Sequence, residues 1–188
     1  NGFHALCERL RTMPIPTICE IGGRVGGGGG ELAASCDMRF GALGRTILCQ
    51  MEVPLGILPG GTGTQRLPAL VGRGRAMEIV LSGDDIDAET LAAWGWLNRV
   101  LPPGQLRAHV NALAARIASF PPEAVSRAKA AVLAASPDPT PGLIEEAFLF
   151  DETVRTDAAR QRMENFLARG GQTPDGERRV GALGAELG

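Results

Sequence analysis

The stretch GGRVGGGGGELAASCD, residues Gly22 to Asp37, contains five consecutive glycines, Gly26 to Gly30, followed directly by Glu31. Glycine loses more conformational entropy on folding than any other residue, so a run of five predicts a place where side chains would obstruct the packing or function of the backbone. TICEI, residues 17–21, precedes the run as an expected buried strand, and ELAASCD follows as an expected short helix. This order of strand, glycines and helix is typical of loops that bind anions.

Two familiar anion-binding motifs do not fit this stretch. A P-loop needs a lysine after its glycines, but the single lysine of the chain is Lys129. A dinucleotide fingerprint needs glycines at its first, third and sixth positions, which no register of Gly22 to Gly30 supplies. The unpaired amides at the start of a helix could instead stabilise the oxygen of a thioester enolate, with Glu31 beside it to exchange a proton. Tight packing of a helix on a strand would also explain the glycines, and this stretch alone leaves both interpretations open.

The composition is ordinary for a soluble globular protein, with 188 residues of which 44% are hydrophobic and 21% charged. A net charge of -2 favours neither a nucleic-acid partner nor a membrane surface, and no apolar run reaches the roughly 18 residues of a spanning helix. The four cysteines have wide spacings and no CxxC pair, which favours free thiols over a metal site: Cys7, Cys19, Cys36 and Cys49. We therefore expect a cytoplasmic protein without a metal.

Periodicity divides the chain into a mixed α/β part and a helical part. We expect strands in MRF (38–40), TILC (46–49) and LNRVL (97–101), a loop over 57–63, and helices over 3–13, 64–72, 75–83, 124–135, 142–155 and 157–169. Asp87 is a suitable N-cap for the helix DAETLAAWG, with Ile86 and Leu91 as its hydrophobic staple. A further helix carries one apolar stripe, made by Leu106, Val110, Leu113 and Ile117.

Three consecutive blocks of the chain resemble the enoyl-CoA hydratase/isomerase family, also called the crotonase family. IPTICEIGGRVGGGGGELAASCDMRF resembles that family's "kPviAav.G.a.GgG.eLa..cD" segment. MEVPLGILPGGTGTQRLPALVG resembles its "pE..lGl.P..GgtqrLpr.vG", and LSGDDIDAETLAAWGWLNRVLP its "ltG..i.A.eA...GlVn.v.p". The resemblance is continuous from about Pro14 to Pro103 and looser to about Arg169. It implies an α/β crotonase-like spiral of ββα units followed by a helical C-terminal oligomerisation region.

The resemblance also implies a division into segments. Residues 1–103 would form the crotonase-like α/β core, without its amino-terminal part, and residues 104–170 the helical C-terminal region. We expect the glycine-rich, polar tail at 171–188 to be disordered.

Site residues carry over from the family by position. Glu31 matches the first catalytic glutamate of the hydratases, and Glu52 matches the second, although the interval is one residue longer than usual and Met51 replaces the family's proline. Gly28 matches one of the two oxyanion-hole amides. Gly27 and Gly60 are the implied substrate-binding positions.

Retaining both glutamates favours hydration within this family. In the family that the chain resembles, the mitochondrial-type enoyl isomerases lack the first glutamate and the naphthoate synthases lack the second. Dienoyl isomerases and 3-hydroxyisobutyryl-CoA hydrolases carry an aspartate in the loop where Pro59-Gly60-Gly61 stands here. The implied substrate is an enoyl-CoA thioester, with coenzyme A as part of the substrate and no other cofactor. Glu31 would act as the base on water and Glu52 as the acid that protonates C2. A homotrimer or a dimer of trimers is implied by resemblance only.

Other polar and aromatic residues have simpler interpretations. Asp37 fits a structural hydrogen-bond acceptor at a helix end, and His4 and His109 lie on expected helices without partners that suggest a triad or a metal site. Arg66 and Arg169 could meet coenzyme A phosphates, but surface positions are commoner for arginine. Trp94 and Trp96 fit core or interface positions.

The start of the chain leaves alternatives open. The sequence begins at Asn1 inside an expected helix, which favours a fragment or a chain whose beginning is not represented. Residues 1–16 contain no counterpart of the family's "SaGaDl" segment, which supplies the second oxyanion amide, and losing one such donor costs roughly 100- to 1,000-fold in turnover. The alternatives to a hydratase are an enoyl-CoA isomerase of the same family and a non-catalytic crotonase-fold oligomer partner.

Overall fold

The computed structural model describes residues 2–187, in which short strands and helices alternate before a run of helices. The strands are β1 (Ile18–Ile21), β2 (Arg24–Gly26), β3 (Met38–Ala42), β4 (Ile47–Cys49), β5 (Ile86–Asp87) and β6 (Arg99–Leu101). The helices of the first part are α1 (Gly2–Thr12), α2 (Gly28–Ser35), the 3₁₀ turn η1 (Val53–Leu55), α3 (Gly63–Val71), α4 (Arg73–Ser82) and α5 (Ala88–Trp94). The later helices are α6 (Pro103–Ala118), α7 (Pro122–Leu133), α8 (Thr140–Val154), α9 (Asp157–Ala168), α10 (Pro174–Arg178) and α11 (Val180–Ala185).

Two three-stranded sheets organise the first hundred residues. One sheet has the order β1-β3-β6 and is parallel throughout, and the other has the order β2-β4-β5, in which β2 and β4 are parallel and β5 is antiparallel. The first four strands of the chain therefore alternate between the two sheets, and β1-β2-α2 and β3-β4-α3 are two consecutive ββα units. This is the predicted spiral arrangement.

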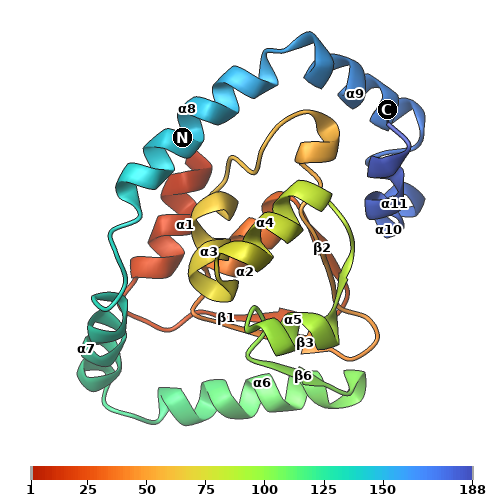
Figure 1. Cartoon of the computed structure of the whole chain (residues 1–188). Coiled ribbons are helices and arrows are strands. Elements are labelled where there is room, and N and C mark those ends of the chain that lie inside the picture. Colours follow the sequence, from red (N-terminus) through yellow and green to blue (C-terminus); the bar gives the residue numbers. More distant parts are fainter. Residues whose placement is uncertain (1, 188) are drawn as a thin grey trace.

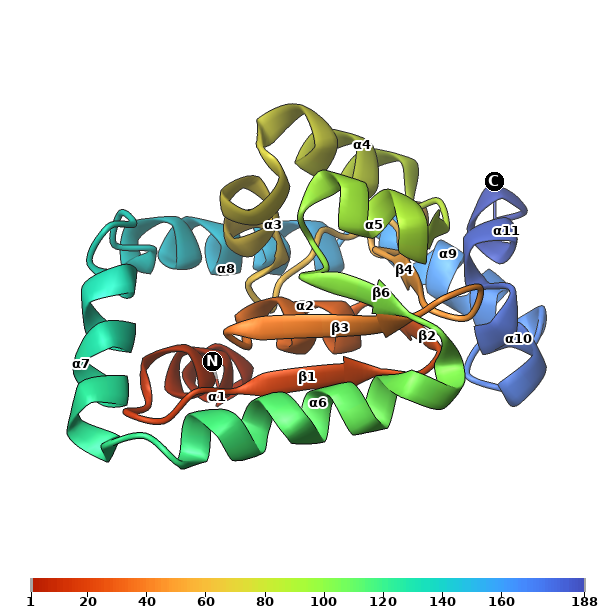
Figure 2. The same cartoon turned by 90° about the horizontal axis from the view of Figure 1, so that it is seen from below.

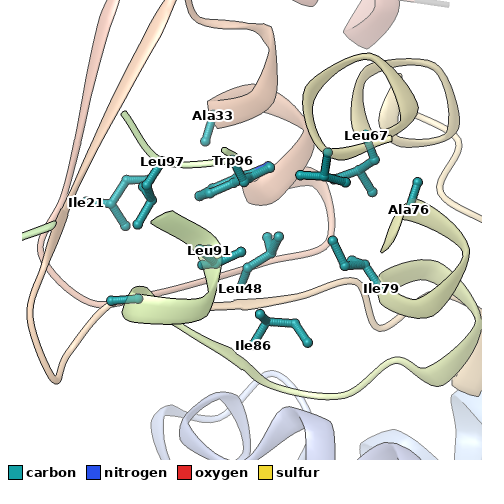
Figure 3. Close-up of a cluster of buried hydrophobic side chains, with 12 residues drawn as sticks. Ile21, Ala33, Leu48, Leu67, Ala76, Ile79, Ile86, Leu91, Trp96 and Leu97 are labelled. Carbon is teal, nitrogen blue, oxygen red and sulfur yellow. The ribbon is translucent and has the colours of Figure 1, made fainter. Parts of the chain in front are cut away.

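The main core lies between the second sheet and the helices α2 to α5. Leu48, Ile79, Leu91 and Trp96 have no exposed surface and pack in one cluster, which Figure 3 shows. Burying side chains of this size contributes roughly 1.5–3 kcal/mol each to folding. The prediction of Trp96 as a core residue is confirmed, and so is the N-cap at Asp87, whose carboxylate accepts the Thr90 amide at 2.8 Å.

Helix α2 begins inside the glycine run, three residues before the predicted start at Glu31. Tertiary packing overrides the low helix propensity of glycine here. Gly27, the N-cap, has φ +50°, a conformation that favours glycine, and a Cβ on Gly30 would lie 2.9 Å from Leu48 Cδ1. These two glycines are therefore required by the fold itself.

Two side chains hold the C-terminal end of α2 in place. Buried Arg39 donates to the carbonyls of Ala33 and Cys36 at 3.3 and 2.6 Å, which satisfies acceptors that a helix end leaves unpaired. Asp37 accepts the Thr17 amide at 2.7 Å and pairs with Lys129 at 2.8 Å. The predicted structural role of Asp37 is confirmed.

The helices from α6 onward extend around the α/β core as a continuous arm, visible in Figure 1. Figure 2 shows α6 running along the sheet β1-β3-β6. Leu106 and Val110 of the predicted stripe pack on Phe40 and Ala42 of β3, with Leu113 at the margin of the cluster. Farther along the arm, α8 returns to the core and contacts α3, so side chains of the helical region pack beside α3.

The prediction of a disordered tail at 171–188 is wrong for residues 174–185, and Gly188 lies outside the described residues. This segment forms α10 and α11. Val180, Leu183 and Leu187 are buried against Cys49 and Phe166. A few apolar side chains are enough to order a glycine-rich segment when a hydrophobic surface is available to them. Composition alone does not reveal that surface.

Candidate active site

Glu31 lies in the first turn of α2, where the glycines before it bring the helix start close to the loop that precedes α3. Its side chain is buried, and Oε1 accepts two backbone amides, from Gly61 and Gly63, each at 2.8 Å. Burial raises the pKa of Glu31 above its ordinary value, and the amides of Gly63 and Gly61 act in the opposite direction because they stabilise the carboxylate. The loop therefore supplies specific partners for an ionised Glu31.

Glu52 lies three residues after the end of β4 and directly before the 3₁₀ turn η1, without a capping hydrogen bond from its side chain. It is 7% exposed, and burial together with the charge of Glu31 raises its pKa to about 8. Glu52 is then protonated at neutral pH. Gln50 Nε2 donates a long hydrogen bond of 3.3 Å to its carboxyl group.

Gln50 lies between the two glutamates. Its amide nitrogen donates to Glu52, and a Cβ placed on Gly63 would lie 3.3 Å from that nitrogen and 2.9 Å from Oε1 of Glu31. Gln50 is 1% exposed, so its side chain has little freedom to move. The structure thus brings Glu31 and Glu52 to one buried place, although 20 residues separate them in sequence.

Gly28 is the first residue of α2, and its amide has no acceptor within the helix because the carbonyls of the preceding turn lie outside it. The residue is exposed, and a Cβ there would have only Phe3 Cζ, at 3.6 Å, within contact distance. The amide is therefore accessible at the positive end of the helix dipole, one turn from Glu31. This geometry suits an oxyanion donor.

Gly27 and Gly60 occupy different surroundings. A Cβ on Gly27 would lie 3.2 Å from Oε1 of Glu52, but the Gly27 amide already donates to the Cys49 carbonyl at 3.0 Å. Gly27 therefore has no amide hydrogen available for a substrate, but the absence of a side chain leaves space beside Glu52. Gly60 faces α8, where a Cβ would lie 2.5 Å from Cγ of Phe150.

Sequence reasoning missed three side chains that surround this site. Gln50 is described above. Glu146 of α8 and His4 of α1 both reach the loop before α3, and His4 Nε2 lies 2.8 Å from the Gly60 carbonyl oxygen. The sequence offers no triad or metal-site partner for His4, and no local pattern joins it to a loop 56 residues away. Glu146 gives no signal in the sequence of α8, because this glutamate is buried while the apolar Ile144 and Phe148 are exposed.

The remaining candidates lie elsewhere or serve the fold. Arg66 is buried, not on the surface, and pairs with Glu8, while Arg169 lies 3.6 Å from Glu186. Among residues 2–187, no group of three His, Cys, Asp or Glu side chains is placed to hold a metal ion. Within the same residues, no helix is long and apolar enough to cross a membrane.

Comparison with known proteins places this geometry in a family. The profile of the family described as "Enoyl-CoA hydratase/isomerase" matches residues 1–173. The short-chain-enoyl-CoA hydratase of Clostridium acetobutylicum is 35% identical over 161 residues, which cover 85% of this chain and 61% of that protein. The crotonyl-CoA hydratase of Syntrophomonas wolfei is 42% identical over 122 residues, 65% of this chain and 46% of that protein.

Solved structures agree with the sequence comparison. The crystal structure of a "putative enoyl-CoA hydratase" from Streptomyces avermitilis superposes with a TM-score of 0.94 and is 40% identical, with 100% of this chain and 68% of that one covered. The predicted crotonase-like fold is thereby confirmed. The chain spans about three fifths of the length of the clostridial relative. The chain belongs to the enoyl-CoA hydratase/isomerase family.

Proposed function

We propose that this chain carries the acid–base site of an enoyl-CoA hydratase, which adds water across the 2,3 double bond of an enoyl-CoA thioester. The observation that supports this most directly is the unequal pair of buried glutamates. Glu31 has two backbone amides on one carboxylate oxygen, and Glu52 has a pKa raised to about 8. One carboxyl group is thus equipped to accept a proton at neutral pH and the other to donate one.

Hydration would begin at C3. Glu31 removes a proton from a water molecule held beside it as the water oxygen bonds to C3. The electron pair of the double bond moves toward the thioester, and the carbonyl oxygen gains negative charge. The Gly28 amide, accessible at the start of α2, would stabilise that oxygen. This is the role that the family resemblance implies for Gly28.

Protonation of C2 would complete the addition. As the carbonyl re-forms, Glu52 delivers its proton to C2, which leaves a 3-hydroxyacyl thioester. Glu31 is now protonated and Glu52 ionised, so transfer of a proton from Glu31 to Glu52 restores the starting state. Both carboxyl groups are buried, and Gln50 donates to Glu52.

The names of two relatives support the substrate class. One is a crotonyl-CoA hydratase and another a short-chain-enoyl-CoA hydratase. We therefore propose an acyl-CoA thioester as the partner of this site, with Gly27 and Gly60 as substrate-binding positions.

The test is the disappearance of the conjugated enoyl-thioester absorbance when crotonyl-CoA is mixed with the chain. Turnover should fall by about 100- to 10,000-fold in each of Glu31→Gln and Glu52→Gln, the usual range for losing one acid–base group. Glu145→Gln, an exposed glutamate on α8, is the matched control and should retain activity. Absence of turnover from the folded chain would overturn the proposal for these 188 residues.

The same variants separate hydration from isomerisation. Moving a double bond needs only one carboxyl group to shuttle a proton, whereas hydration needs a group on water as well. A Glu31→Gln variant that isomerises a 3-enoyl-CoA at the full rate would favour the isomerase. A folded chain that shows no saturable binding of acyl-CoA would favour the non-catalytic oligomer partner.

We also propose that the chain assembles as a trimer or dimer of trimers through its helical arm. Large apolar side chains on the arm are more than half exposed: Val132 on α7, and Ile144 and Phe148 on α8. Exposed apolar groups gathered on one region commonly mark a protein interface. Sedimentation velocity should give a mass three or six times that of the chain. The four free cysteines support a reducing, cytoplasmic location.

A further inference from the structure

A third buried carboxyl group, besides Glu31 and Glu52, lies on the other side of the loop that holds Glu31. Glu146 belongs to α8, and its side chain has no exposed surface. Its Oε1 accepts the Thr62 amide at 2.7 Å, and its Oε2 accepts the Thr64 amide at 3.0 Å and the Thr64 hydroxyl. A helix of the arm thus places its only buried glutamate at the N-terminus of α3.

Four consecutive backbone amides alternate between two carboxyl groups. Gly61 and Gly63 donate to Glu31, and Thr62 and Thr64 donate to Glu146. The loop is therefore held from both sides at every residue. A shift of the loop toward either carboxyl group would lengthen hydrogen bonds to the other.

The backbone at Thr62 needs such restraint. Its φ is +109° and its ψ -6°, a left-handed conformation that β-branched residues rarely adopt. Thr62 has no exposed surface, and its hydroxyl lies 3.2 Å from that of Ser35. A residue persists in this conformation only when its surroundings fix it, and the bond from its amide to Glu146 is one of the contacts that do so.

His4 extends the same restraint to Gly60. Its Nε2 lies 2.8 Å from the Gly60 carbonyl oxygen and 3.1 Å from Oε1 of Glu146. Both partners are acceptors, so this nitrogen carries the hydrogen. Residues 60 to 64 are therefore fixed by side chains from α1, α2 and α8 together.

We propose that Glu146 is a positioning residue of the hydration site. It holds the loop of residues 60–64 in the one conformation that presents the Gly61 and Gly63 amides to Glu31, and through those amides it orients the Glu31 carboxylate. The effect on catalysis rests on the proposed function, whereas the effect on Glu31 does not.

A merely structural role for Glu146 gives a different result at Glu31. Two amide bonds lower the pKa of Glu31 more strongly than the neighbouring charge of Glu146 raises it. If Glu146→Gln removed only that charge, the pKa of Glu31 would fall. If the variant also released the loop, the Gly61 and Gly63 amides would be lost and the pKa of Glu31 would rise. The direction of the change therefore separates the two roles.

The experiment is a titration of the chain labelled with ¹³C at the glutamate carboxyl carbons and followed by NMR. The Glu31 signal is identified by its absence in Glu31→Gln. We expect a higher Glu31 pKa in Glu146→Gln than in the unaltered chain, and no change in the control Glu145→Gln, whose side chain is exposed on the same helix. A fall, or no change, in Glu146→Gln would overturn the proposal.

Thr64→Val covers the case in which Glu146→Gln does not fold. It retains both carboxyl groups and the Thr64 amide and removes the hydroxyl, which donates to Glu146 and accepts from Gln65 Nε2 at 2.9 Å. A smaller rise in the Glu31 pKa supports the proposal, and an unchanged pKa contradicts it.

Hydration of crotonyl-CoA supplies a second readout. In Glu146→Gln we expect kcat to fall by about 100-fold, the loss typical of a catalytic group displaced by about 1 Å, with KM little changed. An unchanged kcat in the folded variant would contradict the positioning role. If the unaltered chain has no turnover, the proposed function fails, while the titration of Glu31 still tests the role of Glu146.

Discussion

The pH dependence of stability should depend strongly on Glu52. Its pKa is about 8 in the folded chain and 4.5 for an unperturbed glutamate. Between these values the folded chain holds a proton that the unfolded chain has released, so the free energy of unfolding falls as pH rises. The contribution is fully present below the unfolded pKa and is lost as pH rises through about 8. Each unit of difference between the folded and unfolded pKa is worth about 1.4 kcal/mol, so Glu52 contributes roughly 5 kcal/mol to the free energy of unfolding in all. Roughly 4 kcal/mol of this is lost between about pH 5 and pH 9.

Glu52→Gln isolates this contribution, because glutamine has the shape of the protonated acid and does not titrate. The free energy of unfolding is measured in urea across this pH range by circular dichroism, at one chain concentration because assembly also changes apparent stability. We expect the unaltered chain to lose about 4 kcal/mol more than the variant as pH rises. Exposed Glu145→Gln should follow the unaltered chain. Parallel curves for the unaltered chain and Glu52→Gln would refute the reasoning that burial keeps Glu52 protonated.

Three further predictions concern stability and are measured by the same urea unfolding. Gly30→Ala should lower the free energy of unfolding by about 1–3 kcal/mol, because the new methyl group would lie 2.9 Å from Leu48 Cδ1. Gly29→Ala, on the exposed face of α2, is the control and should be neutral or stabilising. Asp87→Ala should cost about 1 kcal/mol through loss of the α5 N-cap; an unchanged midpoint would show that the cap contributes nothing. Leu183→Ala should cost about 2–5 kcal/mol, whereas a disordered tail would give no change.

Sequence reasoning worked where the determining interactions are local or where the order of motifs is specific. The N-cap at Asp87 and the apolar stripe of Leu106 and Val110 depend on neighbours three or four residues away, so periodicity reveals them. The order of three blocks indicated the fold, and position within those blocks selected Glu31 and Glu52. The start of α2 was misplaced because helix propensity underestimates glycines that are held by tertiary packing.

The sequence by itself therefore determined the family, the order of strands and helices, and the two glutamates to consider. Tertiary structure alone decided what surrounds them. Burial raises the pKa of Glu52 to about 8, and Glu146 accepts the Thr62 amide across 84 residues of chain, which completes the restraint on the loop at Glu31. Burial and such pairings depend on distances between segments remote in sequence. Local sequence patterns do not determine those distances, because they are set only when the chain packs into its tertiary structure.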